Sequence, residues 1–427
     1  MSGEPRVDAP AGVLTGLRRG AVAEFRGIPY AEPPVGPLRW RAPVRRPRFD
    51  GGFAATAWGA TPQRVPFAEV TAIPEPSIPG DDILTLNVFA PAEGTRLPVL
   101  VWIHGGGYAA GSAASPWYDG RSFVRDGVVV VTIAYRLAFD GFGLLPEAEP
   151  NRGMLDWICA LEWVRDNISA FGGDPHRVTV AGQSAGGGAV LALLACERAQ
   201  PLFDRAISLS GIDLCQTPDE ARQVTEAFAR ELGVPATIEG FAGVSDTALQ
   251  RAARRRRDAQ DGVHLMPVSG DELLPDGIRA GLARSGLDKP LLLGSTADEF
   301  RDPVATDVLF RSTCTRVTRA RRDAAGTWLY SFDWDSPVTG GATHCADLPF
   351  FFDVLDAPGV REKLGAAPQP LATFLHGEVV RFVHGADPAW APARGRTGDD
   401  CRIYDTVPST RSGRYDDVAD MHVKGPT

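Results

Sequence analysis

The chain of 427 residues has 44% hydrophobic and 23% charged residues, which is typical of a folded globular protein and excludes a disordered, collagen-like or coiled-coil chain. Lys and Arg number 44 against 53 Asp and Glu, giving a formal net charge of −9. This acidic balance argues against nucleic acid or an anionic membrane as the main partner.

The chain shows no internal repeat and no long low-complexity linker. Its length is compatible with two or three average domains or with one large α/β domain. Residues 1–95 are rich in turns, with six prolines between Pro29 and Pro47. We expect one domain over residues 1–427, with the turn-rich segment 1–95 packed on it.

Short apolar runs follow this segment and alternate with stretches of helical periodicity. The runs predict buried strands at residues 97–103, 128–135, 178–181, 206–209, 290–293 and 328–334. Helices are expected at residues 154–170, 187–196, 219–232, 245–259 and 371–383. This alternation predicts an α/β fold, with a mostly parallel central sheet and helices on both faces.

No segment is expected to span a membrane. The uncharged stretch 178–196 is interrupted by Gln183, Ser184 and several glycines. The first residues lack the apolar core of a secretory signal. The six cysteines are scattered without paired spacing, which is typical of reduced cysteines in a cytoplasmic protein.

Five arginines cluster at positions 251, 254, 255, 256 and 257. They could form an anion-binding patch, or the solvated face of a surface helix near Asp246, Asp258 and Asp261. The acidic net charge favours the solvated face.

The string Gly182-Gln183-Ser184-Ala185-Gly186 lies between a predicted strand and a predicted helix. A Gly-x-Ser-x-Gly turn in this context predicts a nucleophile elbow, because a serine on a sharp strained turn needs neighbours without bulky side chains. The alternative is an ordinary Gly/Ser turn. The flanking elements favour Ser184 as a nucleophile.

His104-Gly105-Gly106-Gly107 follows the predicted strand 97–103. Glycines let backbone N–H groups approach a developing oxyanion, and such a loop upstream of the serine elbow is typical of lipases and esterases. We expect the donors to be the N–H groups of Gly106, Gly107 and Ala185, with His104 structural. A phosphate loop would need Lys-Ser/Thr after the glycines, where this chain has Tyr108.

The base should follow the serine and an acid in chain order. Of the downstream histidines, His344 sits in a loop after the predicted strand 328–334, whereas His376 and His384 fall on a predicted helix and are expected at the surface. The acid should end a strand, and the strand 290–293 is followed closely by Asp298 and Glu299, which the pattern does not separate. Asp271 and Glu272 are weaker candidates, because no strong strand precedes them.

Together these motifs resemble the type-B carboxylesterase family, which includes cholinesterases and bacterial para-nitrobenzyl esterases. The similar segments also include residues 25–31, 33–36, 38–40, 84–88, 134–137 and 171–175. The resemblance covers almost the whole chain and implies the α/β-hydrolase fold. It assigns the acid to Glu299 and the base to His344.

The chain departs from the family pattern in three places. Neither cysteine of the usual N-terminal disulfide is present near residues 61–63 or 82–84, and Cys345 stands where many members have glycine. The segment between Glu299 and His344 is also shorter than in relatives. We therefore expect a shallower pocket wall and weak dependence on chain length, unless residues 50–79 or the loop after Tyr108 close the pocket.

The sequence thus predicts a serine carboxylic-ester hydrolase with a Ser184, His344 and Glu299 triad and an acyl-enzyme intermediate. It implies a small-molecule ester substrate, no metal and no organic cofactor. Two alternatives are a non-catalytic cholinesterase-like binding protein and a carbamate or amide hydrolase using the same triad. The sequence does not indicate an oligomeric state.

Overall fold

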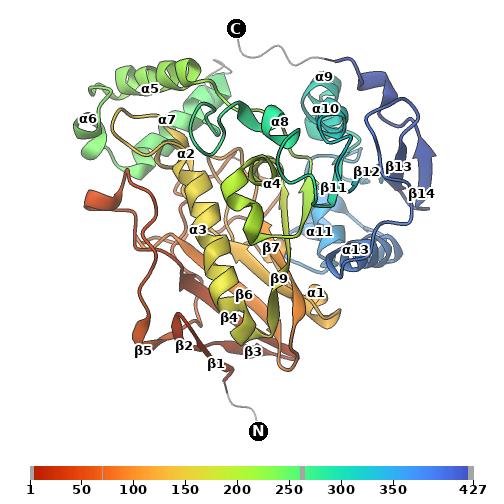
Figure 1. The fold of residues 1–427 in the computed structure, drawn as a ribbon, viewed down its shortest axis with the longest axis horizontal. Coiled ribbons are helices and arrows are strands. Elements are labelled where there is room, and N and C mark those ends of the chain that lie inside the picture. The colour runs from red at the N-terminus through yellow and green to blue at the C-terminus, as the bar shows by residue number, and fades with distance from the viewer. Residues whose placement is uncertain (1–3, 70, 260–264, 422–427) are drawn as a thin grey trace.

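The computed structural model describes residues 4–69, 71–259 and 265–421. An eleven-stranded sheet runs through the molecule in the order β14-β13-β12-β11-β10-β9-β7-β8-β6-β4-β3 (Figure 1). Its strands are β3 (Leu17–Arg19), β4 (Val22–Pro29), β6 (Thr85–Pro91), β7 (Leu97–Ile103), β8 (Val129–Ile133), β9 (Gly173–Gln183), β10 (Arg205–Leu209), β11 (Leu291–Thr296), β12 (Thr327–Phe332), β13 (Asp400–Tyr404) and β14 (Ser409–Ser412).

The strands from β8 to β13 in the sheet order pair in parallel, and antiparallel pairing is confined to both edges. The parallel strands include every strand predicted from the apolar runs. Segment 1–95 supplies β3, β4 and β6 at one edge. It also supplies all three strands of a small separate sheet, β1 (Arg6–Ala9), β2 (Gly12–Thr15) and β5 (Phe49–Ala54).

Helices cover both faces of the large sheet, as the alternating pattern predicts. On one face lie α3 (Arg152–Asn167) and α4 (Ala185–Ala195), with α8 (Gly277–Leu282) and α10 (Ser312–Ala320) next to them. On the other lie α1 (Arg121–Arg125), α11 (Leu348–Phe351) and α13 (Gln369–Val383). Strand β7 shows why both faces are filled: Val99 and Val101 belong to one core, and Leu100 and Trp102 to the other.

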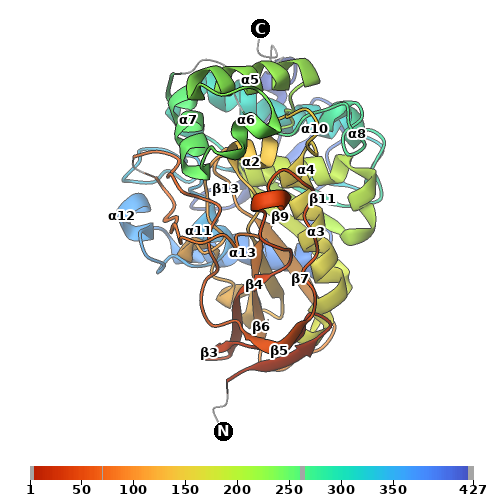
Figure 2. The same cartoon turned by 90° about the vertical axis from the view of Figure 1, so that its left-hand side faces the viewer.

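A group of helices lies over the end of the sheet where β9 passes into α4. It comprises α5 (Pro218–Leu232), α6 (Ile238–Ala242) and α7 (Asp246–Ala259), which stay together in both views (Figures 1 and 2). The remaining short helices are α2 (Ala138–Phe142), α9 (Pro303–Ala305) and α12 (Val360–Leu364).

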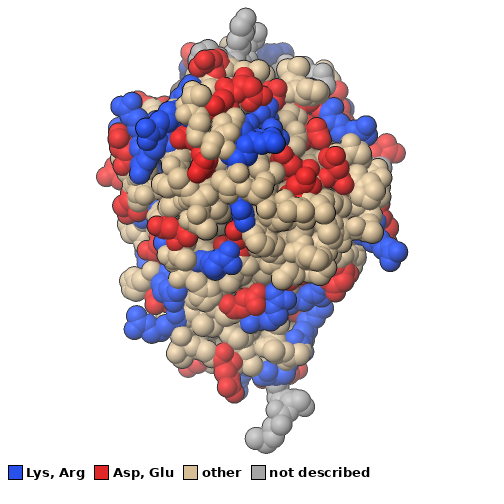
Figure 3. Space-filling view, turned by 90° about the vertical axis from the view of Figure 1, so that its right-hand side faces the viewer, with Lys and Arg blue, Asp and Glu red and all other residues tan. Residues whose placement is uncertain are grey.

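The ion pairs around the arginine cluster favour the face of a surface helix over an anion-binding patch. Arg255 and Arg256 form ion pairs with Glu231 on α5, and Arg254 and Arg257 pair with Asp258, whereas Asp261 lies outside the described residues. On the face drawn in Figure 3, cationic and anionic side chains are interspersed, and the broadest uncharged area lies to the right of the centre. Within the described ranges, no helix is both long and apolar enough to cross a bilayer.

Candidate active site

Ser184 sits at the carboxyl end of β9, between that strand and α4. Its backbone has φ 58° and ψ −122°, a strained conformation for a residue with a side chain. Only glycine fits at the two flanking positions, because the backbone packs too closely there for a side chain. A Cβ on Gly182 would lie 2.4 Å from the Gly186 carbonyl oxygen, and one on Gly186 would lie 2.0 Å from the Ile103 carbonyl oxygen. The predicted elbow geometry is therefore present around Ser184.

The glycine loop that follows β7 faces the same serine. Gly106 and Gly107 both have positive φ, and a Cβ on Gly106 would lie 2.2 Å from the Ala110 carbonyl oxygen. Both glycines line one cavity with Ser184. Across the described part of the chain, the N–H groups of Gly106, Gly107 and Ala185 have no protein acceptor. The three donors remain available to a ligand oxygen.

His344 and Glu299 are brought together by the adjacent strands β11 and β12. Glu299 begins a short turn after β11, and its neighbour Asp298 bridges to Thr343. Glu299 Oε2 accepts a hydrogen bond from His344 Nδ1, and Glu299 Oε1 accepts from the Thr296 N–H at 3.0 Å. Glu299 is fully buried. Asp298 instead lies against Gly341, so the structure separates the two acids that the sequence pattern does not.

The surroundings of His344 favour a charged imidazole. Burial alone would lower the pKa of His344, but Cys345 and the Glu299 carboxylate raise it, and the net pKa is well above its ordinary value. Phe300 stacks on the ring at 4.3 Å between centroids, and Phe310 contacts it at 5.2 Å. Phe300 has φ 53° and is 53% exposed. An aromatic residue in the left-handed region thus holds the imidazole from the solvent side.

The side-chain amide of Gln183 contacts Nε2, the second ring nitrogen of His344. Its Nε2 lies 3.1 Å from His344 Nε2, and the Ser184 hydroxyl has no hydrogen bond in the described structure. With Nδ1 donating to Glu299, Nε2 accepts from the Gln183 amide once the imidazole is neutral, which is the form that acts as the base. The serine must therefore displace this amide when it contacts the base.

The other histidines do not meet Ser184 in this cavity. His104 is fully buried, and its pKa is lowered to about 4 because burial disfavours the charged form. His376 is also buried, bonded to the Phe351 carbonyl and to Asp126, so its expected surface position is wrong: its helix face packs into the core. His264 and His422 lie outside the described residues.

Two cavities meet at Ser184 and Gly107. The larger, of about 450 Å³, is lined by His344 and by residues of segment 67–75. The smaller, of about 150 Å³, is lined by Ala185, Ile212, Phe228 and residues of α7. Residues of the segment 50–79 and residues of the short Glu299–His344 segment, such as Phe300 and Thr343, therefore both line the larger cavity. The weak dependence on chain length stays a prediction.

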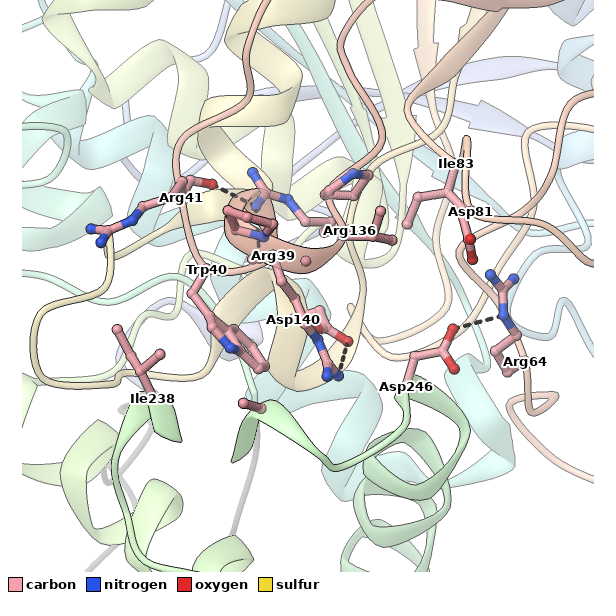
Figure 4. Close-up of a pocket in the computed structure, with 15 residues that line it drawn as sticks. Arg39, Trp40, Arg41, Arg64, Asp81, Ile83, Arg136, Asp140, Ile238 and Asp246 are labelled. Carbon is pink, nitrogen blue, oxygen red and sulfur yellow. Dashed lines mark hydrogen bonds and ion pairs between the residues drawn. The ribbon is translucent and has the colours of Figure 1, made fainter. Parts of the chain in front are cut away.

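A cavity of about 660 Å³ lies elsewhere, between the 34–41 loop and the α6–α7 region (Figure 4). Four of its charged side chains are paired with one another, since Arg64 pairs with Asp246 at 2.7 Å and Arg39 with Asp140 at 2.9 Å. It contains neither a serine nor a histidine. The chemistry of the site therefore belongs to the two smaller cavities at Ser184.

Three residues of these cavities were not predicted to have a role: Gln183, Phe300 and Glu75. Gln183 lies inside the serine motif, but its side-chain direction depends on the fold. Phe300 directly follows the predicted acid. Its ring lies over His344 because its backbone has a positive φ, which the sequence does not indicate. Glu75 lies in a turn-rich segment without a motif.

The model of the carboxylesterase family matches residues 3–305. The para-nitrobenzyl esterase of Bacillus subtilis (strain 168) is 33% identical over 440 residues, covering 89% of this chain and 87% of that protein. The phenmedipham hydrolase of Pseudarthrobacter oxydans is 32% identical over 491 residues, covering 98% and 95%. A solved PNB esterase structure has a TM-score of 0.88 at 30% identity, covering 99% of this chain and 100% of that one. A carboxylesterase of Geobacillus stearothermophilus has a TM-score of 0.84 at 29% identity, covering 97% and 98%.

Proposed function

Because the chain belongs to the carboxylesterase family and is a carboxylic ester hydrolase, we propose that it acts through an acyl-enzyme on Ser184. His344 serves as the base and Glu299 as its acid. The observation that carries this proposal is the meeting of Ser184, His344, Gly106 and Gly107 in one cavity, with Glu299 buried behind the imidazole.

In the first half of the reaction, Ser184 Oγ bonds to the ester carbonyl carbon while its proton passes to His344 Nε2. The carbonyl π electrons move to oxygen, where the N–H groups of Gly106, Gly107 and Ala185 stabilise the negative charge. When the intermediate collapses, the bond to the alcohol oxygen breaks and that oxygen takes the proton from Nε2.

In the second half, water gives a proton to His344 Nε2 and attacks the acyl carbon. The bond to Ser184 Oγ breaks, Oγ recovers the proton, and the carboxylic acid leaves. Glu299 holds the Nδ1 proton throughout and stabilises the imidazolium formed in each half. The substrate is a small-molecule ester, and the six free cysteines support action in the reducing cytoplasm.

Replacing Ser184 tests this proposal. Ser184→Ala should lower kcat/KM for p-nitrophenyl acetate by about 10⁴-fold or more, since no covalent step remains. Ser210→Ala is a matched control, because Ser210 directly follows the adjacent strand β10 and also has positive φ. The proposal fails if Ser184→Ala keeps wild-type turnover, or if the Ser210 variant loses as much activity as the Ser184 variant.

A further inference from the structure

The two cavities at Ser184 must receive different parts of an ester. His344 lines only the larger cavity, and its Nε2 delivers a proton to the departing alcohol oxygen. The alcohol therefore occupies the larger cavity, and the acyl group that stays on Ser184 occupies the smaller one. This step rests on the proposed function.

Glu75 lines the larger cavity, and it is unusual there. Its Oε2 is buried, and neither carboxyl oxygen has a hydrogen-bond partner among the described residues. Arg301, the cation that lines the same cavity, is exposed and forms no ion pair with it. Burial raises the pKa of Glu75 to about 7, with no neighbouring charge offsetting the effect.

The backbone of Glu75 is held in place, so its position on the wall is built rather than incidental. Gln63, itself buried, donates from Nε2 to the Glu75 carbonyl at 3.2 Å and to Ser77 Oγ at 3.0 Å. A further hydrogen bond joins the two ends of the loop 61–78, where the Ile78 N–H donates to Thr61 Oγ1 at 2.8 Å. These bonds close the segment in a chain that lacks the family's disulfide cysteines there.

The neighbouring wall is apolar, since Phe67, Ala68, Ala72 and Ile73 line the same cavity. A carboxyl group with no partner in such a wall destabilises the folded protein. A group on a ligand that donates a hydrogen bond would supply the missing partner. We propose that Glu75 is a specificity-determining residue that accepts a hydrogen bond from the alcohol part of the substrate, so that the preferred esters carry a hydroxyl or N–H donor on their alcohol.

Matched acetate esters test this proposal. The monoacetates of linear α,ω-diols are compared with acetates of n-alkanols that have the same number of heavy atoms, so that only the terminal hydroxyl or methyl differs. In the wild type, kcat/KM for the hydroxyl ester should exceed that of its alkyl partner by roughly tenfold at the chain length that reaches Glu75.

Two variants separate the acceptor from the charge. Glu75→Leu removes the acceptor and should abolish the preference, whereas Glu75→Gln keeps a carbonyl acceptor and should retain it. Both variants should still hydrolyse n-alkyl acetates and should still be labelled covalently on Ser184, which keeps this test separate from a failure of the proposed function. Loss of all ester hydrolysis in folded variants would instead make Glu75 structural and overturn the proposal.

Measurements on the wild type alone remain decisive if a variant does not fold. The free diols should inhibit competitively with roughly tenfold lower inhibition constants than the matched n-alkanols. A hydroxyl-to-alkyl ratio that never exceeds one at any chain length, for both turnover and inhibition, overturns the proposal. So does a ratio unchanged by Glu75→Leu.

Discussion

At the residue scale, the account depends on the protonation of His344. A protonated imidazole cannot take the serine proton, so kcat/KM should rise with pH through the His344 pKa. The ordinary pKa of histidine alone would place this rise at about pH 6.5. Because the Glu299 carboxylate contributes to the raised pKa, we expect the rise above that pH in this protein.

Glu299→Gln should move the acid limb of the kcat/KM profile to lower pH, because the neutral amide no longer stabilises the imidazolium. The same change should reduce kcat by about 10²- to 10⁴-fold. Asp298→Asn is the control, since Asp298 lies against Gly341 rather than against the imidazole. A limb that stays in place in Glu299→Gln, or shifts equally in Asp298→Asn, would contradict the assignment of the acid.

Phe300 offers a second test in which stability and activity separate. Its positive φ costs roughly 1–2 kcal/mol for a residue with a side chain, and its ring supports one face of His344. Phe300→Gly relieves the strain but removes the stack, so the free energy of unfolding should stay equal or rise while kcat falls by roughly tenfold.

Phe300→Ala completes the comparison, because it removes the ring and keeps a Cβ in the strained conformation. It should lose the same activity as the glycine variant but be less stable by about 1 kcal/mol. The two variants are compared by chemical denaturation and by kcat for p-nitrophenyl acetate. Full activity in Phe300→Gly would show that the ring has no positioning role.

At the element scale, the inner parallel strands β7 to β12 were predictable, whereas the parallel strand β13 and the antiparallel strands at the two edges were not. Strands β7 and β9 are buried on both faces and therefore read as continuous apolar runs. Strand β4 contains Arg26, Gly27 and Pro29, and its pairing with β6 shifts register between Phe25 and Ile28. This irregularity hides the strand in a segment that otherwise reads as turns.

The elements around the smaller cavity should set the acyl preference. Ile212 follows β10 and lines this cavity, half-buried, with Phe228 of α5. Ile212→Ala should raise kcat/KM for hexanoate and octanoate esters several-fold and leave acetate unchanged, since each buried methylene contributes about 0.8 kcal/mol. Glu75→Gln is the control and should leave the acyl series unaltered. Gains on the alcohol series instead would reverse the assignment of the two cavities.

At the scale of the whole molecule, Glu75 couples the substrate cavity to stability. Its folded pKa of about 7 lies above the ordinary value of 4.5, so its contribution to stability is full below pH 4.5 and is lost as pH rises through 7. Glu75→Gln should match the wild type near pH 4.5 and be more stable by about 2 kcal/mol at pH 8, allowing for solvent screening.

Asp347, whose pKa is also raised to about 7 by burial, is the same in both proteins and cancels in this difference. Unfolding both proteins by urea at pH 4.5, 6 and 8 measures the difference in their free energy of unfolding. A stability difference that does not grow with pH would mean that Glu75 is ionised and satisfied in the folded protein.

The candidate site itself was largely predictable, because most of its residues belong to motifs whose residue types are required by the local geometry. Glycines at 182 and 186 are required by contacts of 2.4 and 2.0 Å, and such requirements leave a mark in the sequence. The roles of Gln183, Phe300 and Glu75 depend instead on which segments meet in space. Nothing in the local pattern around Glu75 says that segment 67–75 faces His344 across a cavity.

The central claim is that Ser184 carries the acyl group, and covalent trapping tests it most directly. The protein is treated with a fluorophosphonate, and the modified peptide is identified by mass spectrometry. We expect one adduct per chain, on Ser184, in parallel with complete loss of activity, and slower labelling in Glu299→Gln. An adduct on another residue, or full labelling of Ser184→Ala, would contradict the account.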